Sequence, residues 1–367
     1  MHKRTFKNIL ITGGAGFIGA NFIHYLFNCI NNTTHLHGDG ERISEGTNII
    51  NVDKLTYAGN SENLKSIEKN ENYFFYKIDI CDYHAMESVF LKHKIDCIVH
   101  FAAESHVDRS ISSPKDFIMT NIIGTFNLLE LCRKHWNFND NVLFHNISTD
   151  EVYGSLGEKG FFYETSLYDP RSPYSASKAS ADHLVSAYYH TFGLPITISN
   201  CTNNYGPYQF PEKLIPLVIL NIKEEKPIPI YGNGKNIRDW LWVGDHCSAI
   251  LNIIHNGKIG ESYNIGGENE WENIKLVKMI CSIMAETDTL KFKSNREKRF
   301  QNCESLITYV EDRAGHDKRY AINCDKIKNE LGWFQSVDFE TGLRKTVNWY
   351  LENDDWIENI KKRILKF

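Results

Sequence analysis

Short apolar runs alternate with longer amphipathic stretches along the first 200 residues of the chain. The runs are rich in isoleucine, valine, leucine and phenylalanine, and their length is typical of buried strands. They lie at residues 6–11, 48–52, 73–77, 96–101, 142–147 and 196–200. Helical patterns occupy the stretches between them. Because strands that alternate with helices form parallel sheets, the pattern predicts the α/β class, with a Rossmann-type doubly wound parallel sheet.

The chain becomes richer in proline, glycine and asparagine from about residue 206 onwards, with turn signals at 205–207 and 231–234. We therefore predict two domains, at residues 1–205 and 206–367, of which the second is a smaller mixed α/β lobe. Some later segments are expected to return to the first domain. The polar, glycine-containing stretch 31–47 is expected to form a surface loop.

The composition narrows the class of protein only moderately. A chain of 367 residues with 42% apolar and 24% charged residues is ordinary for a soluble globular protein. The net charge of −5 provides no general attraction to nucleic acid or to a membrane. The nine cysteines show no C-x-x-C motif and no clustering with histidine, so we expect no metal site and no disulfide framework. No signal sequence and no apolar run of about 18 residues is visible, which predicts a cytoplasmic protein.

A glycine-rich segment follows the first predicted strand and opens a helix that runs to about Cys29. Its glycines, Gly13, Gly16 and Gly19, let the backbone approach a pyrophosphate, whose charge then meets the helix N-terminus. Asp53 ends the second predicted strand, where a carboxylate accepts hydrogen bonds from an adenine ribose 2′-hydroxyl and repels a 2′-phosphate. The segment therefore predicts a dinucleotide site that prefers NAD to NADP, although the neighbouring Lys54 weakens the preference. The alternative is a glycine turn that serves structure alone.

Two catalytic devices lie between residues 148 and 178. Tyr174 and Lys178 are four apart on a predicted helix, so the ammonium lies beside the phenol. A nearby positive charge is expected to draw the tyrosine pKa down from about 10, which suits a base that takes a proton from an alcohol. Asp150 and Glu151 follow a predicted strand and supply a second acid/base pair. The alternative for these two carboxylates is a solvated loop.

Together these motifs resemble the dTDP-glucose 4,6-dehydratases, a family within the extended short-chain dehydrogenases/reductases. The glycine and Tyr-x-x-x-Lys motifs are shared by the whole superfamily, whereas the epimerases of that superfamily lack the acidic pair of Thr149-Asp150-Glu151. The resemblance runs through nearly the whole chain, at residues 13–19, 51–60, 102–110, 148–154, 174–178, 203–207, 210–216, 238–240 and 312–317.

The resemblance implies a reaction and a role for each catalytic residue. NAD⁺ would take a hydride from C4 of the sugar while Tyr174 takes the hydroxyl proton. Glu151 would then remove the C5 proton, and Asp150 would protonate the departing C6 hydroxyl before the hydride returns to C6. Thr149 would hydrogen-bond the C4 oxygen, and Lys178 would bind the nicotinamide ribose. The product, a 4-keto-6-deoxy sugar nucleotide, would supply rhamnose-type deoxysugar synthesis.

The resemblance also assigns binding residues, with 1–205 as the NAD-binding domain and 206–367 as mainly the sugar-nucleotide lobe. The implied cofactor contacts are Gly13, Gly16, Phe17, Ile18, Gly19, Asp53, Lys54, Leu55, Thr56, Asp79, Ile80, Phe101, Ala102, Ala103, Ser105, Thr120, Tyr174, Lys178 and Asn204. The implied substrate contacts are Ser105, Thr149, Asn203, Lys213, Leu214, Pro229, Tyr231, Arg238, Asn273, Arg313 and His316.

The sequence departs from the family pattern at two positions. Ala314 stands where the family has proline, which is expected to loosen that loop without removing its cation. Leu365 stands where bacterial members have a substrate-contacting tyrosine, which leaves the nucleobase of the substrate open. UDP-glucose is therefore an alternative to dTDP-glucose. A UDP-hexose 4-epimerase would leave the acidic pair without a role, and a non-catalytic NAD-binding regulator would not need Tyr174 and Lys178. Members of the superfamily pair through two long helices, so we expect a homodimer through helices at 110–136 and 175–191.

Overall fold

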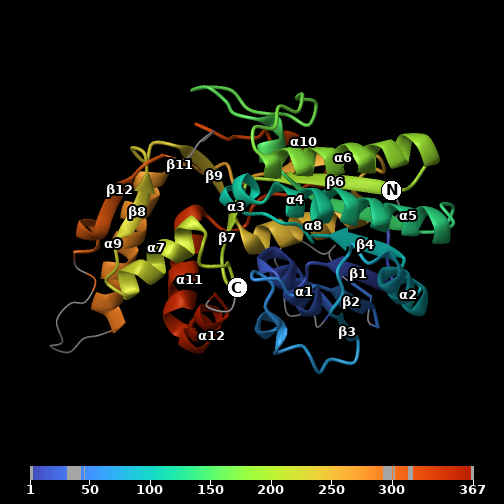
Figure 1. Ribbon diagram of the computed structural model, residues 1–367, viewed down its shortest axis with the longest axis horizontal. Coiled ribbons are helices and arrows are strands. Elements are labelled where there is room, and N and C mark those ends of the chain that lie inside the picture. Colours follow the sequence, from blue (N-terminus) through green and yellow to red (C-terminus); the bar gives the residue numbers. More distant parts are fainter. Residues whose placement is uncertain are drawn as a thin grey trace.

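A computed structural model describes residues 3–30, 43–44, 46–291, 300, 302–312 and 317–364 of the chain. Its centre is a seven-stranded sheet with the order β10-β6-β5-β4-β1-β2-β3. Figure 1 labels β6, β4, β1, β2 and β3 of this sheet. All neighbouring strands are parallel. The strands are β1 (Asn8–Thr12), β2 (Asn48–Val52), β3 (Tyr73–Tyr76), β4 (Cys97–His100), β5 (Leu143–Thr149), β6 (Ile196–Cys201) and β10 (Ser262–Ile265). The six predicted strands and the predicted fold class are confirmed, with ends shifted by one or two residues.

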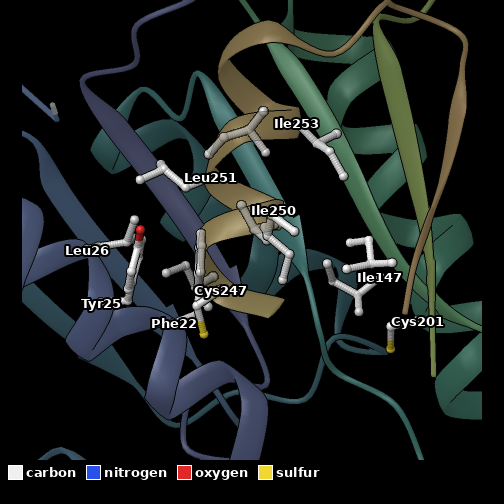
Figure 2. Packing of buried hydrophobic residues seen from close by; sticks show 14 of the residues in the cluster. Phe22, Tyr25, Leu26, Ile147, Cys201, Cys247, Ile250, Leu251 and Ile253 are labelled. Atoms are coloured by element: carbon white, nitrogen blue, oxygen red, sulfur yellow. The ribbon is translucent and has the colours of Figure 1, made fainter. Parts of the chain in front are cut away.

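Helices cover both faces of this sheet because successive strand residues point to opposite sides. In β1, Ile9 and Ile11 belong to one buried cluster and Leu10 belongs to another. The first cluster includes side chains of α1 (Phe17–Ile30) and α8 (Val243–Asn256), which pack together in Figure 2. The second cluster includes side chains of α2 (Tyr83–His93), α5 (Thr125–His135) and α6 (Pro173–Phe192).

The prediction of one continuous helix at 110–136 is wrong. The structure divides this stretch among α3 (Val107–Ser112), α4 (Pro114–Phe117), a π-helical segment η3 (Ile118–Gly124) and α5. Pro114 causes the first break, since proline lacks a backbone N–H and disfavours a helical conformation in the residue before it. Ser113 accordingly has φ −138° and ψ 64°. The helix predicted at 175–191 is α6, which extends the prediction at both ends.

The second lobe is built on two small sheets with the orders β11-β9-β7 and β12-β8. Their strands are β7 (Asn203–Tyr205), β8 (Ile228–Tyr231), β9 (Ile237–Trp242), β11 (Glu270–Glu272) and β12 (Ile307–Val310). The helices α7 (Leu214–Lys223), α9 (Asn273–Lys291), α11 (Phe339–Glu352) and α12 (Asp354–Ile364) supply much of its apolar core. Short 3₁₀ turns lie at η2 (Ser61–Leu64), η4 (Asp150–Tyr153) and η5 (Cys303–Leu306).

The chain returns to the first domain after entering the second lobe. Strand β10 joins β6 at the edge of the large sheet, and α8 packs on α1. Helix α10 (Asp325–Leu331) contacts both β10 and α8. The boundary at residues 205 and 206 stays a prediction. The loop predicted at 31–47 lies mostly outside the described residues. Within the described ranges, no helix combines the length and apolarity needed to cross a membrane.

Arg4 ties the start of the chain to the end of α8. Its Nη2 donates to the carbonyl oxygens of Ile253 (3.0 Å) and Gly257 (2.6 Å), and its Nε donates to that of Ile254 (2.9 Å). The last carbonyl groups of a helix have no partner within the helix, so these donors cap α8.

We expect Arg4→Met to lower the free energy of unfolding by about 1–3 kcal/mol, because it removes charge-assisted hydrogen bonds to these carbonyl groups. Arg4→Lys should recover only part of the loss, since one ammonium lacks the planar fork of donors. Urea unfolding followed by tryptophan fluorescence measures both variants. An unchanged midpoint for Arg4→Met would contradict this role.

Candidate active site

The carboxyl ends of the central strands open into one cleft, as expected where an α/β sheet binds a ligand. Residues from β2, β5 and β6, and from the segments that follow β1, β2, β4, β5 and β6, line this cleft. Most of the predicted site residues are among them. They are Gly13, Gly16, Phe17, Ile18, Gly19, Asp53, Lys54, Thr56, Ile80, Phe101, Ala102, Ala103, Ser105, Thr120, Thr149, Asp150, Glu151, Tyr174, Lys178, Asn203, Asn204 and Lys213.

The glycine loop passes close to the segment that follows β4. Gly13 has φ +71°, and a Cβ atom there would lie 2.7 Å from the backbone N and Cα of Ala102. A Cβ atom on Gly19 would lie 2.4 Å from the carbonyl oxygen of Gly13. Larger residues would therefore clash with backbone at both positions. Gly13, Gly16 and the first residues of α1 line the cleft, and a pyrophosphate binds at such a helix N-terminus.

Asp53 lines the same cleft and is hydrogen-bonded to the glycine loop. Its carboxylate accepts hydrogen bonds from the backbone N–H of Ala15 (3.0 Å) and of Leu55 (2.7 Å). Burial raises the pKa of Asp53, and these two hydrogen bonds act in the opposite direction. Lys54 donates to Thr120 Oγ1 (3.2 Å) and lies 3.6 Å from a carboxylate oxygen of Asp79. The charge of Lys54 therefore also interacts with Asp79 and is not directed at Asp53 alone. Asp53 thus stays suited to accept hydrogen bonds from the two hydroxyl groups of a ribose.

Tyr174 and Lys178 both lie on α6 and both line the cleft. The Lys178 ammonium donates to the carbonyl oxygen of Ile147 (2.7 Å), and burial lowers its pKa. Burial raises the pKa of Tyr174 well above its usual value, the charge of Glu151 raises it further, and a hydrogen bond with Thr149 lowers it. The predicted fall in the tyrosine pKa is therefore wrong for this arrangement, because the two largest influences, desolvation and the charge of Glu151, both raise the pKa.

Asp150 and Glu151 lie in different surroundings although they are adjacent. Strand β5 ends at Thr149, which caps the 3₁₀ turn η4 by accepting the backbone N–H of Glu151 at Oγ1 (3.3 Å). The turn leaves Asp150 only 2% exposed and Glu151 partly exposed.

The pKa of Asp150 is raised well above its usual value. Burial is the largest cause, followed by the charges of Glu151 and Asp239. Arg238 and a hydrogen bond with Thr149 act in the opposite direction. Within the part of the chain that the structure describes, Asp150 Oδ2 is buried without a hydrogen-bond partner. Asp150 is therefore the carboxyl group of the pair that is suited to carry a proton, an assignment that the sequence alone leaves open.

Several predicted residues lie away from the cleft lining. Arg238 on β9 donates to the carbonyl oxygens of Ile237 (2.8 Å) and Asp317 (3.0 Å), and its guanidinium lies 4.4 Å from the centre of the Tyr320 ring. The others outside the lining are Leu55, Asp79, Leu214, Pro229, Tyr231 and Asn273. Arg313 and His316, together with Ala314 and Leu365, fall outside the described residues.

The structure adds acidic and phenolic groups that sequence reasoning did not assign. Asp239 is buried and accepts the backbone N–H groups of Gly267 (3.0 Å) and Asn269 (2.6 Å). The charge of Glu151 acts on Tyr320 and raises its pKa, after the larger effect of burial. Glu212 lines the cleft and accepts a hydrogen bond from Tyr57 (3.1 Å). Asp239 and Glu212 both lie inside segments that carried the family resemblance, which was the available signal.

Known dehydratases match this chain over nearly its whole length. Residues 10–346 match the family model described as GDP-mannose 4,6 dehydratase. A dTDP-glucose 4,6-dehydratase of Shigella flexneri is 52% identical over 96% of this chain and 95% of its own length. A dTDP-glucose 4,6-dehydratase 1 of Escherichia coli K12 is 51% identical over the same shares.

Several solved structures share the fold of this chain. A dTDP-glucose 4,6-dehydratase of Bacillus anthracis in complex with NAD has a TM-score of 0.80 and 45% identity, over 96% of this chain and 99% of its own. A dTDP-glucose 4,6-dehydratase of Streptomyces venezuelae with NAD and a second ligand bound has a TM-score of 0.82 and 38% identity over the same shares. A UDP-glucose 4-epimerase of Thermotoga maritima has a TM-score of 0.77 and 29% identity, over 94% of this chain and 99% of its own.

The raised pKa of Asp150 makes a prediction about stability and pH. Because the pKa of Asp150 is higher in the folded than in the unfolded protein, the folded protein binds more protons at this group. The contribution of Asp150 to stability therefore falls as pH rises above the unfolded pKa of 3.8, and it continues to fall until pH reaches the folded pKa. Asp150→Asn removes this dependence. We expect the variant to gain stability relative to the wild type as pH rises from 4 to 8, in urea unfolding at several pH values. A stability difference that does not change with pH would show that Asp150 is ionised in the folded protein.

Proposed function

The chain belongs to the family of dTDP-glucose 4,6-dehydratases, and we propose that it converts dTDP-glucose to dTDP-4-keto-6-deoxyglucose. The observation that supports this most directly is the buried carboxyl group of Asp150 beside Glu151 in the cleft that holds Tyr174. An epimerase with the same fold needs only to exchange hydride at C4. An acid next to a base is required when water must also be eliminated.

The residues around the cleft fit NAD as the cofactor. Bound NAD supplies a hydride acceptor for C4 and then a hydride donor for C6, so that no net oxidation occurs. The backbone at Gly13, Gly16 and Gly19 would contact the pyrophosphate, and Asp53 would accept hydrogen bonds from the hydroxyl groups of the adenine ribose. Lys178, which lines the same cleft, would bind the nicotinamide ribose.

Each catalytic side chain has a role that its surroundings support. Tyr174 takes the proton of the C4 hydroxyl, and Thr149, which hydrogen-bonds Tyr174, holds the same oxygen. Because burial raises the pKa of Tyr174, this base requires the Lys178 cation one helical turn away. Oxidation at C4 makes the C5 hydrogen acidic. Glu151 removes that proton, and Asp150 donates its own to the C6 hydroxyl, which leaves as water.

The second lobe holds the nucleotide in this proposal. Lys213 lines the cleft and donates to the carbonyl oxygen of Ser105 (3.1 Å), and Arg238 supplies a buried guanidinium near Asp150. Arginine binds a diphosphate through several donors at once. The thymine base is proposed from the substrate named for the relatives, with UDP-glucose as the alternative. Supply of rhamnose-type sugars and a cytoplasmic location stay predictions.

Three substitutions separate the two catalytic devices. With dTDP-glucose added to the NAD-bound protein, Tyr174→Phe should leave NAD oxidised. Glu151→Gln should allow C4 oxidation but block C5 proton removal, so NADH absorbance accumulates with little exchange of the C5 hydrogen in D₂O. Asp150→Asn should slow loss of the C6 hydroxyl while C5 exchange continues. Each turnover rate should fall by about 10²- to 10⁴-fold.

The control variant is Glu304→Gln, which changes an exposed acid on η5 and should keep the wild-type rate. A parallel assay with UDP-glucose tests whether the protein prefers thymine or uracil as the nucleobase of its substrate. The proposed mechanism would be rejected if Glu151→Gln dehydrates either substrate at the wild-type rate.

We also propose a homodimer through α6 and the α4–η3–α5 segment. Exposed apolar side chains gather on these elements, among them Ile118, Met119, Ile123 and Phe126, which are 38–50% exposed, and Phe192 at the end of α6. Such a patch on a monomer surface usually marks an interface. A twofold dimer would bury the patch of each copy against that of the other.

Light scattering at micromolar concentration should give the mass of a dimer, twice the 42.4 kDa of one chain. The double substitution Met119→Glu and Phe126→Glu should shift the protein to the monomer mass, because it places four charges in the interface of each dimer. A monomer mass for the wild type would rule out this interface.

A further inference from the structure

Helix α6 carries a buried carboxylate that has no part in the proposed reaction steps. Asp182 is 2% exposed and lies one helical turn beyond Lys178 and two turns beyond Tyr174. It does not line the cleft. Its oxygens accept hydrogen bonds from Asn146 Nδ2 (2.8 Å), Ser148 Oγ (2.6 Å) and Tyr168 OH (3.1 Å). Burial of a carboxylate costs free energy unless such donors surround it.

These contacts join α6 to three successive residues of β5. Asp182 binds the side chains of Asn146 and Ser148, and Lys178 binds the carbonyl oxygen of Ile147 between them. The strand ends immediately afterwards, at Thr149. The contacts of Asp182 and Lys178 with residues 146–148 therefore fix where the Thr149–Glu151 turn lies relative to α6.

A further set of hydrogen bonds ties the same region to β6. Asn200 Nδ2 donates to the carbonyl oxygen of Thr149 (3.2 Å) and approaches Tyr168 OH (3.5 Å), which itself donates to Asp182. Tyr168 precedes α6 in the loop that follows η4. Asp182 thus connects α6, β5 and this loop, which together surround the acid/base groups.

We propose that Asp182 is a positioning residue that holds the Thr149–Glu151 turn in register with Tyr174 and Lys178. The proposal rests on the dehydratase function above. In that function Tyr174 and Thr149 must meet one substrate oxygen while Glu151 reaches the adjacent carbon. A shift of about 1 Å between the two segments is enough to slow such a reaction by about 100-fold.

The test compares Asp182→Asn with the wild type as NAD-bound enzymes, using dTDP-glucose and dTDP-glucose deuterated at C4. We expect kcat to fall by about 10- to 100-fold while KM stays within about threefold and bound NAD is retained. The deuterium isotope effect on kcat should rise, because misplacement of Tyr174 and Thr149 makes C4 oxidation limiting. A smaller active fraction caused by poor folding would lower kcat without changing the isotope effect.

Two milder variants and one control complete the experiment. Ser148→Ala and Tyr168→Phe each remove one donor to Asp182, and each should lower kcat several-fold and raise the isotope effect; Ser148→Ala decides the matter if Asp182→Asn does not fold. Asp96→Asn is the control. Asp96 accepts the backbone N–H groups of Lys7 (2.7 Å) and Asn8 (2.9 Å) at the amino end of β1, the end of the sheet away from the cleft. This variant should lower the melting temperature and leave kcat and the isotope effect unchanged.

The outcomes separate this proposal from the proposed function. An active wild type whose Asp182 and Ser148 variants keep its kcat and isotope effect would overturn the role of Asp182 alone. The same holds if kcat falls with no change in the isotope effect. A wild type that does not convert dTDP-glucose would overturn the dehydratase function, and the positioning role with it.

Discussion

Burial of one carboxyl group beside two others is the constraint on which the chemistry depends. Asp150 shares its surroundings with Glu151 and Asp239, and burial together with both charges favours its protonated form. Glu151, the next residue, remains partly exposed. Two identical functional groups thereby lie in different surroundings, which suits an elimination that needs one acid and one base. The difference arises from the 3₁₀ turn at the end of β5, which turns Asp150 inward.

The parallel sheet places this turn beside the other parts of the site. All strands of the sheet run in one direction, so the glycine loop after β1, Asp53 after β2 and the acid pair after β5 meet at one edge. Helix α6 brings Tyr174 and Lys178 to the same edge. Residues separated by more than a hundred positions therefore line one cleft. The second lobe adds Asn203, Asn204 and Lys213 to its lining.

Sequence patterns predicted the sheet, and they singled out the glycine loop, the acid pair and Tyr174 with Lys178, which the structure brings to one cleft. Each of these patterns depends on local spacing, and the catalytic roles stay predictions. The tyrosine pKa was predicted wrongly because burial and the charge of Glu151 both raise it. Neither the burial of Tyr174 nor its proximity to Glu151 follows from spacing along the sequence. The helix at 110–136 was predicted as continuous although Pro114 offered a visible signal for the break. Asp182 could not be assigned, since its partners on β5 lie near it only after folding. Asp239 lay inside a segment of the family resemblance, but its partners at 267–269 also lie near it only after folding.

In the proposed reaction, oxidation at C4 and reduction at C6 occur in one cleft within one turnover. The fate of the C4 hydrogen shows whether both steps occur there. The NAD-bound protein is supplied with dTDP-glucose deuterated at C4 in ordinary water, and the product is analysed by mass spectrometry and NMR. We expect the deuterium to be retained in the product at C6, and the same reaction of unlabelled substrate in D₂O to introduce solvent deuterium at C5. Loss of the C4 deuterium to solvent, or a 4-keto product that keeps its C6 hydroxyl, would contradict it.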